Sequence, residues 1–345
     1  MKLNYRASLR TFCKCPCLAS FGNSLRLFAM LLTVLLAANA AKGAPAAPKA
    51  PSIRFLSLKS GMYLYLEDVA RFYGMSTKLE GKDITLNSRY ATVKLSIDSR
   101  VMVLNNVQMH LSRAITQSGT HLLIGKSDFS CLLEPVLRTK TLPRRKVRHI
   151  LIDPGHGGKD VGAVSGNTYE KNINLQVAQR LAKKLQTHGY TVSMTRTKDA
   201  DVSLEERVNI AKKLRPDAFI SLHCNSASSS VTGLEIYIAT PAGDAPTNDN
   251  HVSKGACPAN VFNADNTFLA FFAQQAILQR TRMADRGIRR RRYYVVRNVP
   301  FPCMLVEMGF ISNKAELAQL RSTYRQEQIA DAITEAVGRY RDATK

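Results

Sequence analysis

Four side chains in the second half of the chain are of types that bind a metal ion or move a proton. They are His156 in DPGHGG (153–158), Glu170 fourteen residues later, His223 in SLHCN (221–225) and Glu307 in MLVEMGF (304–310). Two imidazoles and one carboxylate form a His₂Glu set, the ligand type that holds catalytic zinc and leaves one position open for water. Glu307 stands among apolar neighbours, where an unpaired carboxylate is costly to bury, so a purely structural explanation fits it poorly.

Taken singly, the other three residues also have structural explanations. Any one histidine is more often a hydrogen-bonded or surface group than a ligand, and Glu170 could be an exposed acid favoured by a helix dipole. Their combination favours a metal site. Successive strand residues face opposite sides, so we expect Cys224 in the core rather than as a fourth ligand beside His223. The remaining histidines are expected to be structural or exposed: His110, His121, His149, His188 and His251.

The elements that must position these residues alternate between strand and helix from Arg148 onward. The expected strands are His149–Ile152, Thr191–Thr195, Phe219–Cys224, Leu234–Ile238, Tyr293–Val296 and Met304–Val306. A helical stripe runs through Ile173, Val177, Leu181 and Leu185 to a stop at Gly189, and Ser203 with Glu206 predicts a capping box for a helix through Leu214. Such alternation predicts an α/β fold, in which sites gather at the carboxyl ends of strands.

The N-terminal region predicts export. The first 40 residues contain five Lys or Arg and no acidic residue, and a mostly apolar run (27–41) contains Ala38-Asn39-Ala40. This pattern is typical of a secretory signal peptide over residues 1–40, with an uncleaved anchor as the alternative. No apolar run reaches the ~18 residues of a membrane-spanning helix, so we expect no stable membrane insertion after signal cleavage.

Further boundaries follow from composition. The composition predicts an Ala/Pro linker over residues 41–52 and a basic linker over residues 141–147. Between them, residues 53–140 predict a small α+β domain, with a helix near 67–73 and strands near 84–86, 91–97 and 101–106. Asn105-Asn106 predicts a tight turn. The last and largest domain spans residues 148–342.

Composition describes a basic globular protein. Of 345 residues 45% are hydrophobic and 22% charged, and 49 Lys and Arg against 26 Asp and Glu give a net charge of +23. An exported protein rarely meets nucleic acid, so an anionic cell wall or membrane surface is the better partner and the periplasm or cell wall the expected location. Cys131, Cys224, Cys257 and Cys303 are too few for a disulfide framework, although one bridge remains open.

Residues 148–340 resemble the catalytic domain of zinc-dependent N-acetylmuramoyl-L-alanine amidases, the Amidase_3 family. The matching segments are IDPGHGG (152–158), EKNINL (170–175), MTR (194–196), SLEERVNIA (203–211), FISLHCNS (219–226) and PFPCMLVEMGFISN (300–313). The resemblance implies a mixed, mainly parallel sheet flanked by helices, and zinc bound by His156, Glu170 and His223. It also implies peptidoglycan as substrate, cleaved between the lactyl group of N-acetylmuramic acid and L-alanine, with Glu307 as general acid/base.

Two segments depart from the family pattern. About 25 residues, Thr240 to Asp265, stand where many Gram-negative relatives carry a plugging insertion. Their Gly/Pro/Asn-rich composition predicts a loop, so we expect an open site or control by another route, and the sequence points to no particular activator. Arg286 with Arg289–Arg292 could form a solvated basic turn, or a groove rim that attracts stem-peptide carboxylates.

Residues 60–135 resemble, more weakly, the copper-amine-oxidase-like N-terminal domain found on wall hydrolases. No copper is implied, because the segment contains no ligand cluster. A wall-targeting or spacer role and a plain structural role both fit this accessory domain.

Two other functions remain open at this point. A zinc peptidase or carboxypeptidase could cut within the stem peptide using the same ligands. A non-catalytic wall-binding protein would be expected to have lost at least one of the four site residues, and all four are present.

Overall fold

The computed structural model describes residues 52–247, 249, 251–252 and 255–345. The expected signal peptide and all but the last residue of the Ala/Pro linker lie outside the described residues. Within the described part, no helix combines the length and the apolar character needed to cross a membrane.

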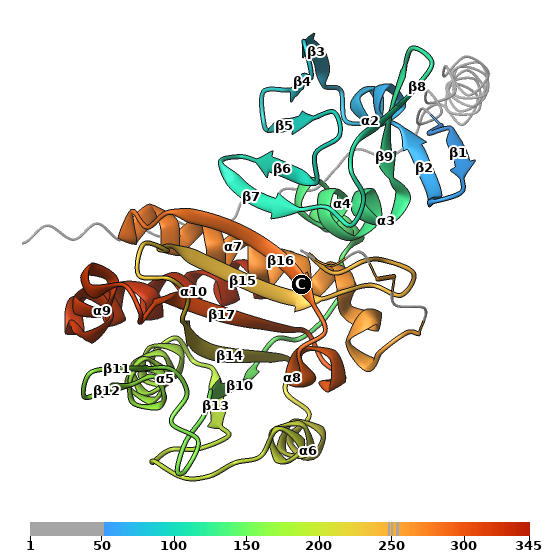
Figure 1. The fold of residues 1–345 in the computed structure, drawn as a ribbon. Coiled ribbons are helices and arrows are strands. Elements are labelled where there is room, and N and C mark those ends of the chain that lie inside the picture. The colour runs from blue at the N-terminus through green and yellow to red at the C-terminus, as the bar shows by residue number, and fades with distance from the viewer. Residues whose placement is uncertain (1–51, 248, 250, 253–254) are drawn as a thin grey trace, which may run out of the picture. The chain divides into compact units, whose positions relative to one another are not determined.

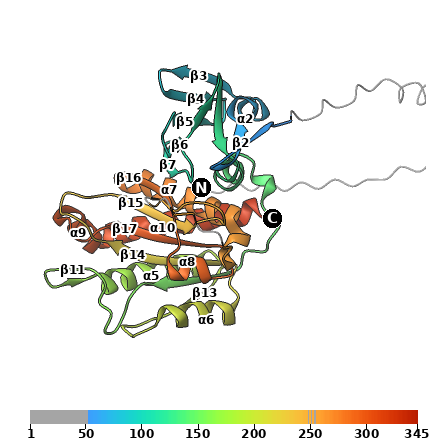
Figure 2. The ribbon, with the colours of Figure 1, turned by 45° about the vertical axis from the view of Figure 1, so that its right-hand side comes forward.

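A single large sheet organises the described residues (Figures 1 and 2). Within them, eleven strands follow the order β13-β10-β14-β17-β15-β16-β7-β6-β5-β4-β3. Neighbours from β13 to β17 are parallel, β17 and β15 are antiparallel, β15-β16-β7 are parallel again, and the strands from β7 to β3 are antiparallel. This confirms the expected mixed α/β sheet.

The strands of this sheet come from both halves of the chain. Their bounds are β3 Ser76–Glu80, β4 Asp83–Asn87, β5 Thr92–Ser96, β6 Val101–Leu104, β7 Val107–His110, β10 His149–Pro154, β13 Thr191–Met194, β14 Ala218–Asn225, β15 Leu234–Ala239, β16 Asp285–Arg291 and β17 Cys303–Phe310. The turn between β6 and β7 has positive φ at Asn105 (47°) and Asn106 (64°), which confirms the predicted tight turn.

Helices flank the sheet. The longer ones are α5 Glu170–Thr187, α6 Leu204–Leu214, α7 Asn263–Thr281, α9 Lys314–Arg321 and α10 Thr323–Ala343, with short α8 at Tyr294–Asn298 and a 3₁₀ turn η3 at Pro258–Phe262. Helix α5 buries Ile173, Val177, Leu181 and Leu185, as the stripe predicted. The predicted Ser203–Glu206 capping box is present at the start of α6.

The N-terminal segment adds a second, smaller sheet. Its order is β1-β2-β9-β8, with bounds β1 Phe55–Leu58, β2 Gly61–Tyr65, β8 Thr116–Ser118 and β9 His121–Gly125. Short helical pieces accompany it: α2 Leu66–Phe72, α3 Lys126–Asp128, η1 Phe129–Leu133, α4 Glu134–Leu137 and η2 Thr139–Thr141. A two-stranded hairpin, β11 Val164–Ser165 with β12 Thr168–Tyr169, precedes α5.

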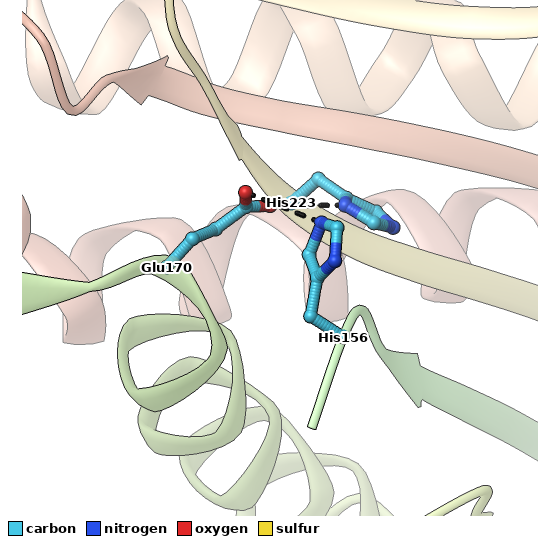
Figure 3. A group of neighbouring side chains, drawn as sticks. All are labelled: His156, Glu170 and His223. Atoms are coloured by element: carbon cyan, nitrogen blue, oxygen red, sulfur yellow. Dashed lines mark hydrogen bonds and ion pairs between the residues drawn. The ribbon is translucent and has the colours of Figure 1, made fainter. Parts of the chain in front are cut away.

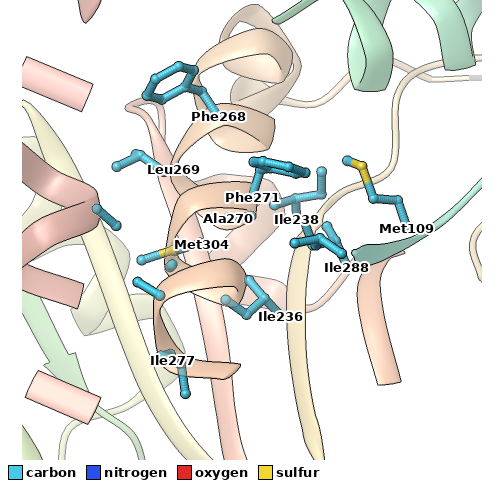
Figure 4. Packing of buried hydrophobic residues seen from close by; sticks show 14 of the residues in the cluster. Met109, Ile236, Ile238, Phe268, Leu269, Ala270, Phe271, Ile277, Ile288 and Met304 are labelled. Atoms are coloured by element: carbon cyan, nitrogen blue, oxygen red, sulfur yellow. The ribbon is translucent and has the colours of Figure 1, made fainter. Parts of the chain in front are cut away.

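One hydrophobic core joins the N-terminal strands to the rest of the sheet. Met109 of β7 and Ile288 of β16 are paired neighbours, and both are fully buried. Phe271 of α7 belongs to the same cluster and lies beside them (Figure 4). The described residues accordingly belong to one structural unit. The predicted boundary near residues 141–147 therefore falls between segments that share a core.

In the region after α7 the structure contradicts one expected strand and one of the two alternatives for the arginine run. Tyr293–Val296, expected as a strand because of its aromatic and β-branched residues, belongs largely to α8. Arg289–Arg291 lie in β16, not in a turn, and Arg290 is 1% exposed. Helix α8 packs Val295 and Val296 into the smaller core cluster, so tertiary packing overrides the local strand preference.

Candidate metal centre

Three side chains from different elements converge on one point (Figure 3). His156 follows β10, Glu170 begins α5 and His223 lies on β14. The Nε2 atom of His156 lies 3.2 Å from Oε2 of Glu170, and Nδ1 of His223 lies 3.0 Å from Oε1. Candidate ligand atoms of the three residues all lie within 4.8 Å of one another. The structure therefore brings together the three residues predicted as metal ligands.

The bend that carries His156 depends on glycine. His156 itself has φ of 59°, a left-handed conformation that is uncommon for residues other than glycine but that histidine, asparagine and aspartate adopt more often than most. A Cβ at Gly155 would lie 2.1 Å from the His223 ring, and one at Gly162 would lie 2.6 Å from Oε2 of Glu170. Both glycines let the backbone approach the ligands closely, and the one at Gly155 explains part of the DPGHGG pattern.

Two buried arginines hold the carbonyl groups of this bend. Arg207 donates to the carbonyl oxygens of Pro154 and His156, both at 2.9 Å. Arg196 donates to the carbonyl oxygens of Pro154 at 3.0 Å and Gly155 at 2.9 Å. These contacts fix the backbone on both sides of the histidine and explain why MTR and SLEERVNIA accompany the ligand segments.

Asp153 anchors the same region from within the sheet. It is fully buried and accepts hydrogen bonds from Arg207 at 2.6 Å, Thr195 at 2.6 Å and Ser221 at 2.8 Å. Burial alone would raise its pKa, but Arg207 and the two hydroxyl donors hold the pKa below its ordinary value. Asp153 thus remains a carboxylate that ties β10, α6 and β14 together beneath the site.

The ligands are oriented by a second set of contacts. Nδ1 of His156 lies 2.7 Å from Oδ2 of Asp160, which leaves Nε2 directed at the centre. Glu170 accepts hydrogen bonds from the backbone N–H of Ala163 at 2.9 Å and of Cys224 at 3.0 Å, and from the Asn174 amide at 3.1 Å. A carboxylate behind a ligating imidazole is a common feature of zinc sites. Sequence reasoning missed Asp160, although it stands four residues after His156.

The electrostatics favour a negatively charged Glu170. Burial opposes its ionisation, but the contacts with His156 and His223 hold its pKa well below the ordinary value. Burial also opposes protonation of His156, while Glu170 and Asp160 outweigh it and raise the His156 pKa. These shifts describe a site that attracts positive charge. A His₂Glu donor set with an orienting carboxylate fits zinc.

Glu307 stands beside this group in the sheet. It pairs directly with His223 across β14 and β17, so the two side chains share one face. Among the described residues its Oε2 atom has no hydrogen-bond partner. Burial, and secondarily Glu170 and Glu235, raise the Glu307 pKa well above its ordinary value. A carboxyl group in such a setting suits proton transfer.

A second glutamate, Glu235, faces Glu307 across β15 and β17 and was not predicted. In contrast to Glu307, it is fully partnered: Arg286 donates at 2.7 Å, the Tyr237 hydroxyl at 2.6 Å and the Asn225 amide at 3.1 Å. His223, Glu307 and Glu235 therefore form one row across three adjacent strands. The sequence signal for Glu235 is a lone acid in the apolar run LEIYIA.

A cavity of about 390 Å³ opens beside the two histidines. Its walls come from the His156 bend, the loop before α6, the start of α6 and α8. The lining residues are Asp153, His156, Gly157, Asp160, Asp201, Val202, Ser203, Leu204, Arg207, His223 and Val295. This cavity gives a ligand access to the centre.

The other candidates for chemistry lie outside the group. Cys224 is 2% exposed and belongs to the core, as expected, and Cys131, Cys224, Cys257 and Cys303 are free thiols. The remaining histidines contact other neighbours: His110 the Arg286 carbonyl, His121 Glu67, His149 Ser193, His188 the Lys184 carbonyl and His251 Asp249.

The fold and the site together define an α/β protein with a candidate metal centre at the carboxyl ends of its strands. Residues 150–339 match the family model Amidase_3, described as N-acetylmuramoyl-L-alanine amidase, and the chain belongs to this family. The match covers the three candidate ligands and Glu307.

The chain is also similar to individual proteins. The chain is 32% identical over 194 residues to the uncharacterized protein YqiI of Bacillus subtilis, covering 56% of this chain and 84% of that one. It is 30% identical over 233 residues to the N-acetylmuramoyl-L-alanine amidase LytC of Bacillus subtilis, covering 65% of this chain but 43% of LytC. A crystal structure of an N-acetylmuramoyl-L-alanine amidase from Clostridium difficile 630 aligns with a TM-score of 0.50 and 30% identity, covering 58% of this chain and all of that one.

Proposed function

We propose that the protein is a zinc-dependent peptidoglycan amidase that hydrolyses the amide bond between the lactyl group of N-acetylmuramic acid and the L-alanine of the stem peptide. The observation that carries this proposal is the convergence of His156, Glu170 and His223 beside Glu307. Family membership and the activity named for LytC support the choice of amide bond. The expected signal peptide supports action after export, in the periplasm or cell wall.

His156, Glu170 and His223 would hold the zinc ion. Zinc bound there would supply Lewis acidity toward water and toward the amide carbonyl. Asp160 keeps the His156 ring oriented through Nδ1, and the donors around Glu170 keep its carboxylate fixed. The three metal ligands are therefore held in position by the chain itself, which lowers the free-energy cost of ordering the site.

Glu307 performs the proton transfers. As a carboxylate it takes a proton from the attacking water while the new C–O bond forms at the lactyl carbonyl carbon. The C–N bond then breaks, and Glu307 returns the proton to the departing L-alanine amine, because an amide nitrogen leaves readily only when protonated. The products are the lactyl carboxylic acid on the glycan and a stem peptide with a free amino terminus.

The test is digestion of purified sacculi by the exported protein, with products identified by mass spectrometry. The expected products are intact stem peptides that begin with L-alanine, and a chelator should abolish their release. Shortened stems would instead indicate a peptidase, and binding without products would indicate a wall-binding protein. Either of these results would overturn the proposal.

A further inference from the structure

The sheet face that carries Glu307 continues without interruption into the N-terminal segment. Its residues alternate with the buried set: β4 buries Ile84 and Leu86, β5 Val93 and Leu95, β6 Met102 and Leu104, and β7 Val107 and Met109. The residues between them are exposed or half-buried. We define the open face by five residues that lie on it: Arg289, Gln108, Val101, Val103 and Lys94. Glu235 lies on the same side of the sheet but is only 3% exposed.

The register joins this face to the metal centre. Glu307 pairs with His223 on one side and with Glu235 on the other. On the N-terminal side, Gln108 pairs with Val103 and Val103 with Lys94. Cross-strand partners share one face of a sheet, so each of these two rows lies on a single side.

The two rows meet where β16 and β7 run side by side. The backbone N–H of Gln108 donates to Asp285 at 2.7 Å, and Nε2 of His110 lies 3.1 Å from the Arg286 carbonyl oxygen. A Cβ at Gly287, whose φ is 86°, would lie 3.0 Å from the Gln108 carbonyl oxygen. The glycine thus permits the close approach that makes the face continuous.

Two arginines mark the middle of the open face. Arg286 and Arg289 both contact Oε1 of Glu235 through Nε, at 2.7 and 3.4 Å. Among the described residues, neither has a hydrogen bond from its terminal guanidinium nitrogens. Those nitrogens remain available to a second acidic group, and guanidinium binds carboxylate in a bidentate fashion. The Arg286 side chain is 34% exposed and the Arg289 side chain 11%, so Arg286 is the more accessible of the two.

The dimensions suit a short peptide. Adjacent strands lie about 4.8 Å apart, so the four steps from β17 to β6 span roughly 19 Å. An extended chain advances ~3.3–3.6 Å per residue, so about five or six residues would cover that distance. A peptide attached at the scissile amide could therefore run from Glu307 past the arginines onto β7 and β6.

We propose that the open face binds the carboxylate-bearing peptide portion of the substrate, so that the N-terminal segment contributes directly to substrate recognition. This inference rests on the proposed amidase function and assigns a role to strands outside the family match, which covers residues 150–339. Lys94 at its far end adds positive charge, and Val101 and Val103 offer apolar contact.

The test places a negative charge on the open face at two exposed positions. Val101→Glu and Lys94→Glu are compared with matched controls at exposed residues that are not part of the open face, Val261→Glu on η3 and Lys59→Glu in the β1–β2 turn. Val101 is 37% exposed and Val261 79%, and both lysines are exposed, so all four variants should fold. The probe is a soluble muropeptide with free stem carboxylates, set beside the same compound with those carboxylates methyl-esterified.

We expect the unaltered enzyme to show a lower KM for the free acid than for the ester. Each open-face variant should raise the KM for the free acid by about two- to fivefold, the scale of a partly exposed charge contact. Each should also reduce the preference of the enzyme for the free acid over the ester. The controls should keep the parent KM and preference. An unchanged KM and preference in both open-face variants would overturn the inference.

A binding measurement separates this inference from the proposed function. Fluorescence anisotropy of the labelled free-acid muropeptide is measured on a Glu307→Gln protein, with and without Val101→Glu. Weaker binding with the added charge supports muropeptide binding at the open face, even if the parent enzyme cleaves nothing. Absence of cleavage would overturn only the proposed activity. Equal binding overturns the inference that the open face binds the peptide, and it leaves any observed cleavage activity unaffected.

Discussion

His223 and Glu307 occupy directly paired positions on the adjacent parallel strands β14 and β17. Their side chains share one face, yet they differ in partners: His223 contacts Glu170 at 3.0 Å, whereas Oε2 of Glu307 has no partner within the described residues. The sheet thus places a metal ligand and an unpaired carboxyl group side by side. The two residues should have separable roles.

The first prediction concerns that separation. His223→Ala should lose both bound zinc and sacculus hydrolysis, because it removes one of three ligands. Glu307→Gln should keep zinc near one equivalent and lose at least about 10²-fold in turnover, the scale of general acid–base catalysis. Metal analysis of the purified variants and product release measure the two effects. Parent-level turnover in Glu307→Gln would contradict the assigned role.

The second prediction concerns Asp160. Replacing it with asparagine removes the carboxylate that orients the His156 ring while leaving all three ligands in place. Zinc affinity should fall by about 10- to 100-fold, as for other partners of ligating histidines. Competition with a chromogenic chelator measures the change. Asp201→Asn, on the same cavity wall, is the control, and an equal loss in both variants would argue against a specific orienting role.

The third prediction concerns Arg207 beneath the site. Arg207→Met leaves buried Asp153 without its cation and should lower the free energy of unfolding by about 3–5 kcal/mol. Adding Asp153→Asn should recover part of that loss, because the unpaired charge disappears. Urea denaturation of the single and double variants measures both effects. Arg89→Met, at an exposed position, should change stability little, and additive losses in the double variant would rule out coupling.

The fourth prediction concerns pH. Because burial raises the Glu307 pKa, the folded state binds its proton more tightly than the unfolded state does. The raised pKa therefore does not affect the free energy of unfolding below the unfolded-state pKa of about 4.3. Above that pH it lowers the free energy of unfolding, and the effect grows until the folded-state pKa is reached. In chelator, Glu307→Gln should stabilise the metal-free protein by about 1–3 kcal/mol at neutral pH.

The same variant provides its own control at low pH. Near pH 4 the parent carboxyl is protonated in the folded state and largely protonated in the unfolded state, so the two proteins should differ little. Thermal unfolding across pH 4–8 measures the difference. A stability gain that is constant over this range would show that ionisation of Glu307 is not its cause.

The fifth prediction concerns the join between the N-terminal segment and the rest of the unit. Arg290 of β16 donates to Asp128 of α3 at 2.8 Å, and both are almost fully buried. Asp244, which lies 3.4 Å from Arg290, is bound in turn by Arg113 at 2.8 Å. Arg290→Met should cost about 3–5 kcal/mol, because it leaves buried carboxylates without their shared cation.

Hydrogen exchange tests whether the N-terminal strands and β16 lose stability together in this variant. Amides of β7 and β16 should lose protection together in Arg290→Met, since one core covers both strands. In Arg282→Met, where the arginine is exposed, neither strand should change. Loss of protection confined to β16 would show that the N-terminal strands are stabilised independently.

Most elements around the site could be predicted from local patterns. Helix α5 has clear apolar periodicity. His156 follows β10 and Glu170 begins α5, where chemistry is expected, whereas His223 and Glu307 lie inside β14 and β17. The sequence also favoured placing Cys224 in the core, because strand residues alternate between faces. These features depend on neighbours only a few residues away, so the sequence displays them directly.

Features that depend on distant partners could not be predicted. Arg290 belongs to a run of four arginines that suggests an exposed turn, and its burial depends on Asp128, 162 residues away. Likewise the Tyr293–Val296 segment has strand-forming residues, and only packing against the smaller core cluster makes it helical. The pairing of β7 with β16 rests on Met109 and Ile288, for which no local pattern exists.

The position of β7 has a further consequence for any shortened catalytic fragment. In the intact chain β7 lies against the outer side of β16, so the main-chain groups of β16 on that side are not free to pair with another molecule. A fragment that begins after residue 141 would present that side to solvent as a bare edge. Bare edges recruit strands from other molecules. Such fragments should self-associate and precipitate on concentration unless the β16 border is shielded by an added strand or a charged substitution.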